Sequence, residues 1–226
     1  MKALRNLAIL RSGALTLGLY LTLTILALAA GPMEDVKGLM DQVIALIQDP
    51  AFQSPGQKAA RLQLIEKITA HRLDYQEMGK RCLGDTWDTL SKSQRSEFAN
   101  LFSQLLKISY ADRLDELAKA KVVYEKETRK GDQAEVSVVI VRPNDKIPVT
   151  FHLQQAPQGW KIYDLGVDGV SLMSNLKSQF SRVIQTSSYG NLVECLKVQL
   201  RARKVDVEAC PPPSDTKKPK PQKAEC

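Results

Sequence analysis

The sequence predicts an α+β domain in which a curved antiparallel sheet of about four strands is covered by helices. Apolar residues recur at helical spacing before Lys121, alternate as in strands from there to Val167, and return to helical spacing after Gly169. The turns between the expected strands are short, which favours antiparallel pairing. One face of such a sheet is apolar and needs a cover, and the flanking helices are available to provide it.

The expected helices before the sheet each have an apolar stripe or a start signal. Apolar residues follow helical spacing from Val36 to Ile47. The segment Ser54-Pro55-Gly56-Gln57 has the composition of a capping box, with proline at the first helical position. A short helix from Tyr75 to Leu83 ends at Gly84. A second capping box, Ser91 to Gln94, opens a long helix. The apolar stripe of that helix comprises Phe98, Leu101, Phe102, Leu105, Leu106 and Tyr110.

Four strands are expected, separated by turn signals at Gly131-Asp132, Pro143 to Asp145 and Pro157 to Gly159. The first strand begins at Val122, and the second runs from Ala134 to Arg142. The third is centred on Phe151, and the fourth runs from Trp160 to Val167. The inward faces of the central two strands are Val136, Val138 and Ile140, and Val149, Phe151 and Leu153. Two further helical stripes follow: Leu172, Met173, Leu176, Phe180, Val183 and Ile184, and then Leu192, Val193, Leu196 and Leu200.

The two ends of the chain differ in composition from the domain between them. Basic residues precede an uncharged run from Ser12 to Ala30 that contains Ala27-Leu28-Ala29, so residues 1–29 are expected to be a signal peptide cleaved after Ala29. The alternative is an uncleaved membrane anchor. Both interpretations place the rest of the chain outside the cytoplasm. The folded domain is expected at 33–205, followed by a disordered Pro/Lys-rich tail at 206–226.

Charge and cysteine content narrow the possible functions. The formal net charge is +7, and removal of Lys2, Arg5 and Arg11 with the signal leaves 7 − 3 = +4. This mild excess does not indicate nucleic-acid binding, which usually shows a concentrated basic stripe with aromatic residues. The four cysteines, Cys82, Cys195, Cys210 and Cys226, allow three complete pairings, and the sequence does not choose among them. Cys195 lies in an apolar stripe and is interpreted as a buried thiol, whereas Cys210 and Cys226 could pair within the tail.

No catalytic or metal-binding constellation is recognised. The sequence contains neither G-x-S-x-G nor H-E-x-x-H. His71 falls near a helix end and His152 on the polar side of a strand, so both are interpreted as structural or surface residues. Asp164 and Asp168 could in principle form an acid–base pair, but their position beside two glycines favours a role in turns and caps. The protein is therefore not expected to be an enzyme or to carry a cofactor or metal.

Two blocks of sequence carry a family resemblance. The first is the segment 75–84, with Trp87, Leu90-Ser91 and 94–98 after it. The second is Ile147-Pro148-Val149, then Gly159-Trp160-Lys161-Ile162-Tyr163-Asp164, Gly169-Val170-Ser171-Leu172, Asn175 and Ser178-Gln179-Phe180. With continuous spacing from Val36 to Arg203, the chain resembles the MlaC (toluene-tolerance) family. The four cysteines and the tail are not part of that resemblance.

The resemblance implies an NTF2-like sheet wrapped by helices, with a lipid pocket between them, in a periplasmic protein that carries phospholipid as cargo. It also implies exchange with an inner-membrane ABC transporter complex and an outer-membrane lipoprotein complex, which maintains the lipid asymmetry of the outer membrane. A hopanoid or another lipid is the alternative cargo. An exported enzyme and a pure interaction module are the alternatives from other classes.

The expected pocket walls are apolar, and the headgroup stays near water because burying an unpaired phosphate is costly. Weak headgroup discrimination follows. The expected sheet walls are Val136, Val138, Ile140, Val149, Phe151 and Leu153. The expected helix walls are Leu101, Leu105, Tyr110, Val170, Leu172 and Met173. Each of these residues, taken alone, fits an ordinary core better than a pocket lining, because most buried apolar residues simply pack. Lys80 and Arg81 could meet phosphate at the mouth or form a solvated helix face.

Overall fold

The sheet has five antiparallel strands whose spatial order follows their order in the chain. A computed structural model describes residues 30–111 and 114–202. The strands are β1 (Lys121–Lys130), β2 (Gln133–Val141), β3 (Lys146–Ala156), β4 (Gly159–Val167) and β5 (Val170–Ser171). The α+β prediction is confirmed, and the four expected strands are present. The fifth strand, β5, was not predicted.

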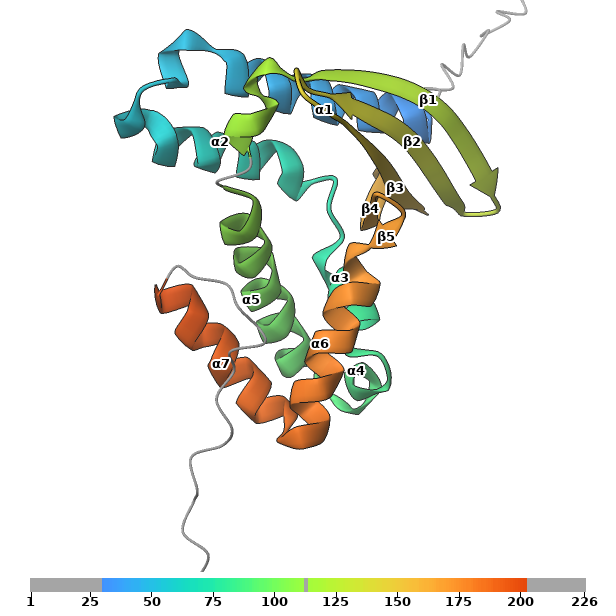
Figure 1. Ribbon diagram of the computed structural model, residues 1–226. Helices are drawn as coiled ribbons and strands as arrows, with labels where there is room; N and C mark the ends of the chain where they lie inside the picture. The colour runs from blue at the N-terminus through green and yellow to red at the C-terminus, as the bar shows by residue number, and fades with distance from the viewer. Residues whose placement is uncertain (1–29, 112–113, 203–226) are drawn as a thin grey trace, which may run out of the picture.

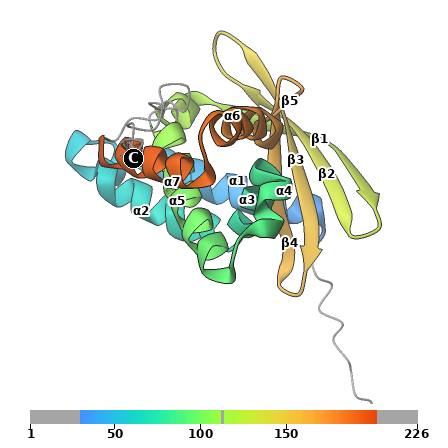
Figure 2. The same cartoon turned by 90° about the horizontal axis from the view of Figure 1, so that it is seen from below.

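The helices precede and follow the sheet. Before it come α1 (Pro32–Gln48), η1 (Pro50–Phe52), η2 (Pro55–Gln57), α2 (Lys58–Ala70), α3 (Tyr75–Leu83), α4 (Asp85–Thr89), α5 (Lys92–Ala111) and η3 (Leu114–Lys119). After it come α6 (Leu172–Thr186) and α7 (Tyr189–Ala202). Figure 1 shows α1 lying along the sheet, whereas α5, α6 and α7 extend away from it. Figure 2 shows that the helices lie to one side of the sheet.

The two predicted capping boxes have different outcomes. At Ser91 the box forms in both directions: the Gln94 backbone N–H donates to Ser91 Oγ at 3.3 Å, and the Ser91 N–H donates to Gln94 Oε1 at 2.9 Å. Ser54 does precede a helical turn with Pro55 at its first position, but its side chain makes no capping hydrogen bond. That turn is the short 3₁₀ helix η2, which leads directly into α2.

Strand register assigns each sheet residue to one of two faces. Val136 pairs with Phe151 and Phe151 with Leu165, while Val138 pairs with Val149. These side chains point toward the helices, and the four residues of the central strands β2 and β3 are buried. The alternation read from the sequence is therefore confirmed, and this inner face forms one wall of the core.

Helix α1 is fixed against the inner face by a buried carboxylate. Asp35 accepts a hydrogen bond of 3.0 Å from the Trp160 backbone N–H of β4 and forms a 2.8 Å ion pair with Arg72, which follows α2. Only 5% of Asp35 is exposed, so its charge depends on these partners. Asp35 thus connects α1, the end of α2 and the sheet.

The helices that extend from the sheet meet in an aromatic cluster. Phe98 of α5 stacks on Phe102 with ring centroids 5.9 Å apart and meets Phe180 of α6 edge to face at 5.9 Å. Trp87 of α4 approaches Phe98 at 6.5 Å in the same edge-to-face manner. This cluster holds α4, α5 and α6 together.

The β4–β5 connection explains the unpredicted strand. Asp168 and Gly169 have φ values of +50° and +77° and form a two-residue turn of the kind that suits tight hairpins. The sequence interpretation of Asp168 as a turn residue is thus confirmed. The chain folds back for only two residues before α6 begins, and so short a strand has no periodicity to detect.

Other predictions concern the ends of the chain and the cysteines. The expected signal peptide, the end of the domain beyond residue 202 and the tail lie outside the described residues. Within residues 30–111 and 114–202, no helix has the length and hydropathy needed to cross a membrane. Cys82 is a buried free thiol, whereas Cys195 is disulfide-bonded, so the interpretation of Cys195 as a thiol was wrong. The possible pairing of Cys210 with Cys226 concerns residues outside the described part of the chain.

Candidate functional site

A cleft of about 650 Å³ opens between α2 and α5, with α7 at one end. This volume falls within the range of about 300–1,000 Å³ that is typical of ligand sites. Its exposed lining is more apolar than polar. The lining residues are Pro55, Gly56, Lys58, Ala59, Leu62, Gln63, Glu66, Lys107, Ile108, Tyr110, Ala111 and Leu200.

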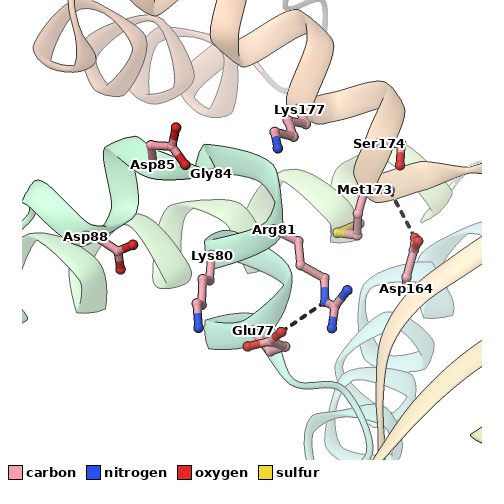
Figure 3. A pocket seen from close by; sticks show the side chains of 10 residues that line it. All are labelled: Glu77, Lys80, Arg81, Gly84, Asp85, Asp88, Asp164, Met173, Ser174 and Lys177. Carbon is pink, nitrogen blue, oxygen red and sulfur yellow. Dashed lines mark hydrogen bonds and ion pairs between the residues drawn. The ribbon is translucent and has the colours of Figure 1, made fainter. Parts of the chain in front are cut away.

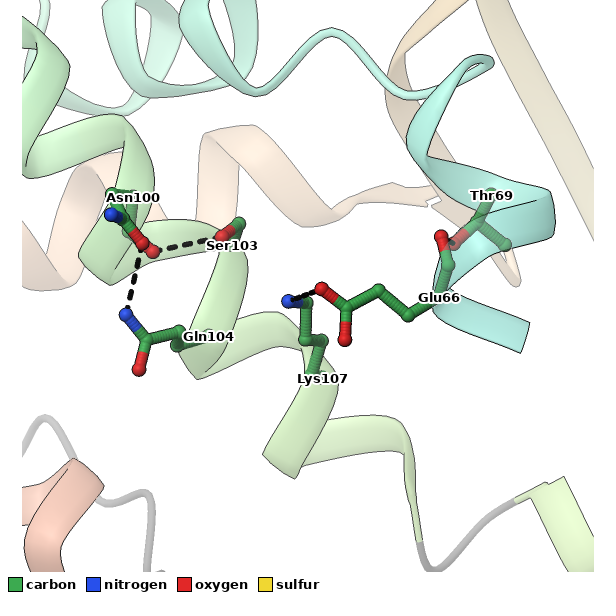
Figure 4. Close-up of polar contacts among 6 residues, drawn as sticks. All are labelled: Glu66, Thr69, Asn100, Ser103, Gln104 and Lys107. Carbon is green, nitrogen blue, oxygen red and sulfur yellow. Dashed lines mark hydrogen bonds and ion pairs between the residues drawn. The ribbon is translucent and has the colours of Figure 1, made fainter. Parts of the chain in front are cut away.

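One ion pair crosses this cleft. Lys107 of α5 pairs with Glu66 of α2, and Figure 4 shows the two side chains reaching toward each other from the facing helices. The Thr69 hydroxyl donates to the Glu66 carbonyl oxygen at 3.2 Å, within the same turn of α2. The Lys107 side chain is 29% exposed and that of Glu66 45%, so the pair sits at the mouth and not in the interior.

Tyr110 brings a phenol to the cleft wall. Burial raises the pKa of Tyr110, and the neighbouring Tyr75 and Glu66 raise it further. The phenol therefore remains neutral at physiological pH. A neutral phenol has an apolar ring and a single polar tip, which suits a wall between an oily interior and water.

Helix α2 can form a cleft wall because it has two apolar faces. Ile65 and the stem of Arg61 are buried toward the body of the domain, where the Arg61 guanidinium pairs with Asp115 of η3. Leu62 lines the cleft and also packs against the edge of the core. Because α2 has apolar side chains on two faces, it has no single amphipathic stripe, and the face that borders the cleft is available to a ligand.

A second cleft, of about 480 Å³, lies among α3, α4 and the start of α6 (Figure 3). Arg81 forms a 3.0 Å ion pair with Glu77 and stacks 3.7 Å above the Tyr163 ring. Most of the remaining lining is charged or polar: Lys80, Asp85, Asp88, Asp164, Ser174 and Lys177. Positive and negative side chains alternate there, so this cleft lacks the apolar walls that a hydrocarbon chain needs.

Asp164 contributes to that second cleft but has a structural role. It lies within β4, is only 8% exposed, and accepts hydrogen bonds from the backbone N–H groups of Leu165 (2.7 Å) and Met173 (3.0 Å) and from the Ser171 hydroxyl. Ser171 in turn caps α6 by accepting from the Ser174 N–H at 2.9 Å. The turn expected for Asp164 is wrong, because Asp164 lies within β4. The capping role is confirmed, because its carboxylate accepts from the Met173 N–H in the first turn of α6 and so holds the start of that helix against the sheet.

The two histidines lie outside both clefts. His71 follows the last residue of α2 at its C-terminus, as expected. His152 lies on the outer side of β3 with its Nδ1 3.4 Å from a Glu135 carboxylate oxygen. Among the described residues, no group of three or more His, Cys, Asp or Glu side chains is placed to hold a metal ion.

The predicted wall residues are distributed between core and surface. Seven of them are buried: Leu105, Val136, Val138, Val149, Phe151, Leu153 and Met173. Four are half-buried: Leu101, Tyr110, Ile140 and Leu172. The last three of these pack against the core. Val170 was expected on a helix wall but lies on β5 and is 61% exposed, which corrects that placement. Tyr110 lines the α2–α5 cleft and Met173 lines the charged cleft.

Most of the lining of the α2–α5 cleft was missed by the sequence-based prediction. Leu200 was recognised only as a member of a helical stripe, and Ala59, Ile108 and Ala111 were not singled out. The two-sided apolar pattern of α2 was the available signal. It could not be used without knowing that α5 lies opposite, because the segments are far apart in the chain.

Comparison with known proteins places this architecture in a family. The family model described as MlaC protein matches residues 37–198, which is most of the chain. The chain belongs to the MlaC family. This membership agrees with the resemblance of the two sequence blocks, whose second part forms the β3–β4–α6 junction around Asp164.

Two relatives of this MlaC family member illustrate its similarity. The intermembrane phospholipid transport system binding protein MlaC of Haemophilus influenzae is 24% identical over 121 residues, which is 51% of this chain and 56% of that protein. The match thus spans little more than half of that relative. A phospholipid-binding protein from Ralstonia solanacearum, solved in complex with a phospholipid, superposes with a TM-score of 0.67 at 23% identity, covering 77% of this chain and 99% of the other. At this identity the likeness concerns the fold.

Proposed function

We propose that this MlaC family member is a periplasmic phospholipid carrier and not an enzyme. It would exchange lipid with an inner-membrane ABC transporter complex and an outer-membrane lipoprotein complex. The observation that carries the proposal is an apolar cleft of about 650 Å³ in a fold shared with a phospholipid-bound protein. The curated relative that is named for intermembrane phospholipid transport supports the same cargo.

The lining of the cleft suits the burial of acyl chains. Each acyl methylene that leaves water contributes about 0.8 kcal/mol, so a carrier needs an apolar wall more than it needs specific polar contacts. Leu62, Ile108 and Leu200 provide such a wall from three different helices. The headgroup would remain at the mouth, where Lys107 and Glu66 are already partly hydrated.

Tyr110 connects this cleft to the walls predicted from the sequence. It lies on α5 together with Leu101 and Leu105, and Leu105 packs in the core that includes Val136 and Phe151 of the sheet. We propose that acyl chains enter beside Tyr110 and extend toward this core. The involvement of the twelve predicted wall residues remains a prediction that substitution can test.

The experiment compares two apolar residues of α7. Leu200→Asp places a charge in the cleft, whereas Val198→Asp places the same charge on the same helix at a side chain that is 56% exposed. Native mass spectrometry of each purified protein measures co-purified lipid, and uptake of a labelled phospholipid measures binding. Leu200→Asp is expected to lose most of its lipid while Val198→Asp retains it.

Three outcomes decide the proposal. Loss of lipid from Leu200→Asp alone, with unchanged circular dichroism, supports it. A wild-type protein that is empty and takes up no labelled phospholipid would overturn it. If the extracted lipid is a hopanoid and not a phospholipid, the carrier role stands but the cargo assignment is wrong.

A further inference from the structure

The outer face of the sheet is not covered by helices, which lie on the opposite side (Figure 2). Register identifies the side chains of this face. Ser137 alternates with the buried Val136 and Val138 and pairs with Lys126 on one side and Thr150 on the other. In the same way Val123 pairs with Val139, and Val139 with Pro148. The outer face is therefore accessible to solvent along β1, β2 and β3, whereas Asp164 and Gly166 on the same face of β4 are buried.

Lysine dominates the charge of this face. Register places five lysines on it: Lys121, Lys126 and Lys130 of β1, Lys146 of β3 and Lys161 of β4. Within the described part of the chain, none of these five forms an ion pair. On the helical side, Lys37, Lys107 and Lys197 are paired with carboxylates, whereas other exposed lysines such as Lys67, Lys80 and Lys92 are not paired among the described residues.

Few acids offset these lysines. Glu135 lies on the outer face but faces His152, and Asp164 is buried under its three hydrogen-bond donors. Glu125 sits in the β1 bulge, where the register shifts. Even if the bulge residue is counted, the lysines outnumber the exposed carboxylates of this face.

Apolar side chains accompany the lysines at one end of the face. Val123 is 47% exposed, its neighbours Val139 and Val141 are half-buried, and Pro148 is exposed. Lys121 and Lys146 flank Val141 across the strands. A surface that combines unpaired lysines with exposed small apolar side chains has the composition that binds at a lipid–water interface.

We propose that this outer face, defined by the five lysines and Val123, docks on a membrane surface that contains anionic phospholipid. A membrane fits better than an acidic protein for two reasons. All five cations are lysines, which act as flexible point charges, whereas bidentate recognition of carboxylates favours arginine. The lysines also lie along the edge strand and at strand ends, which suits the diffuse field of a charged bilayer. This inference goes beyond the proposed carrier role and does not require the cleft to hold lipid.

The test is sedimentation with vesicles of defined composition. The purified protein is mixed with vesicles of phosphatidylcholine alone or of equal parts phosphatidylcholine and phosphatidylglycerol, and the pelleted fraction gives the partition coefficient. Binding is expected only to the anionic vesicles and is expected to weaken as ionic strength rises. Protein that stays in the supernatant is not bound to vesicles, so any lipid extracted from it measures the carrier role separately from membrane docking.

A matched pair of triple variants localises the binding. Lys121→Gln/Lys126→Gln/Lys146→Gln removes three charges from the outer face, and Lys67→Gln/Lys80→Gln/Lys92→Gln removes three exposed charges from the helices. The first variant is expected to bind anionic vesicles roughly tenfold to a hundredfold more weakly than the second, on the basis of the typical contribution of each surface lysine.

Four outcomes oppose the proposal. Equal binding by the two variants would overturn it, as would binding to neutral vesicles that is insensitive to salt. Absence of vesicle binding by the wild type would also overturn it. If an acidic polypeptide such as polyglutamate binds this face while vesicles do not, the face is a protein-docking surface and the membrane assignment is wrong.

Discussion

Replacing Asp164 by alanine is expected to lower the free energy of unfolding by about 3–5 kcal/mol, a figure that follows from its three hydrogen-bond donors. The carboxylate is 8% exposed and accepts from Leu165 N, Met173 N and the Ser171 hydroxyl. Each buried donor that is left without a partner costs about 1–3 kcal/mol. The estimate stays below the full sum because the Ser171 hydroxyl can rotate toward another acceptor.

Asparagine at the same position separates charge from hydrogen bonding. Asp164→Asn keeps an acceptor oxygen for one or two of the backbone donors but loses the charge, so about 1–2 kcal/mol is expected. For a domain of this size, each kcal/mol shifts the melting temperature by roughly 2–4 °C. Asp164→Ala should therefore melt roughly 6–20 °C below the wild type, and Asp164→Asn should fall between them.

Urea unfolding followed by circular dichroism measures these free energies, and a thermal melt provides the second readout. Asp88→Ala is the control, because Asp88 lines the same charged cleft but is exposed on the short helix α4. Its effect should stay within about 0.5 kcal/mol. If Asp164→Ala unfolds within about 1 kcal/mol of the wild type, then the carboxylate does not hold α6 on the sheet and the reasoning is refuted.

Two further predictions concern Cys82 and the pair across the cleft. Burial, reinforced by the nearby charge of Asp164, raises the pKa of Cys82, so alkylation at pH 8 mapped by mass spectrometry should leave Cys82 unmodified until the protein unfolds. The unfolded state loses this proton near the ordinary thiol pKa of 9.0, whereas the folded state keeps it, so the free energy of unfolding should decrease as the pH rises above about 9. Rapid labelling of Cys82 in the native protein would contradict the raised pKa. Lys107→Met removes the partly exposed pair with Glu66 and should change stability by less than about 1 kcal/mol. The same variant should speed exchange of a labelled phospholipid by up to roughly fivefold because α2 and α5 separate more easily, and an unchanged or slower rate would show that the pair does not restrain the cleft.

The architecture was largely accessible from the sequence because its signals are local. The alternation of Val136, Val138 and Ile140 identified the inner face of β2, and the capping box at Ser91 located the start of α5. Strand and helix periodicities depend only on which neighbouring side chains are apolar, so they survive without tertiary information. The two sequence blocks that carry the family resemblance are local in the same sense.

The candidate site was accessible only in part, because it is formed by residues that are distant in the chain. Glu66 and Lys107 are 41 positions apart, and no local pattern indicates that α2 faces α5. The sequence could identify the apolar side chains that fill an interior, but it could not separate those that pack against each other from those, such as Leu62 and Leu200, that border open space. That distinction depends on how well the facing surfaces fit.

Periodicity and capping thus determined which segments form helices and strands and which faces they bury. The tertiary structure alone decided where a cleft remains and that the Asp164 carboxylate joins β4 to α6. It also decided that Cys195 is disulfide-bonded while Cys82 remains a thiol. The physical reason is that hydrogen bonds, disulfides and cavities depend on distances between segments, and only packing sets those distances.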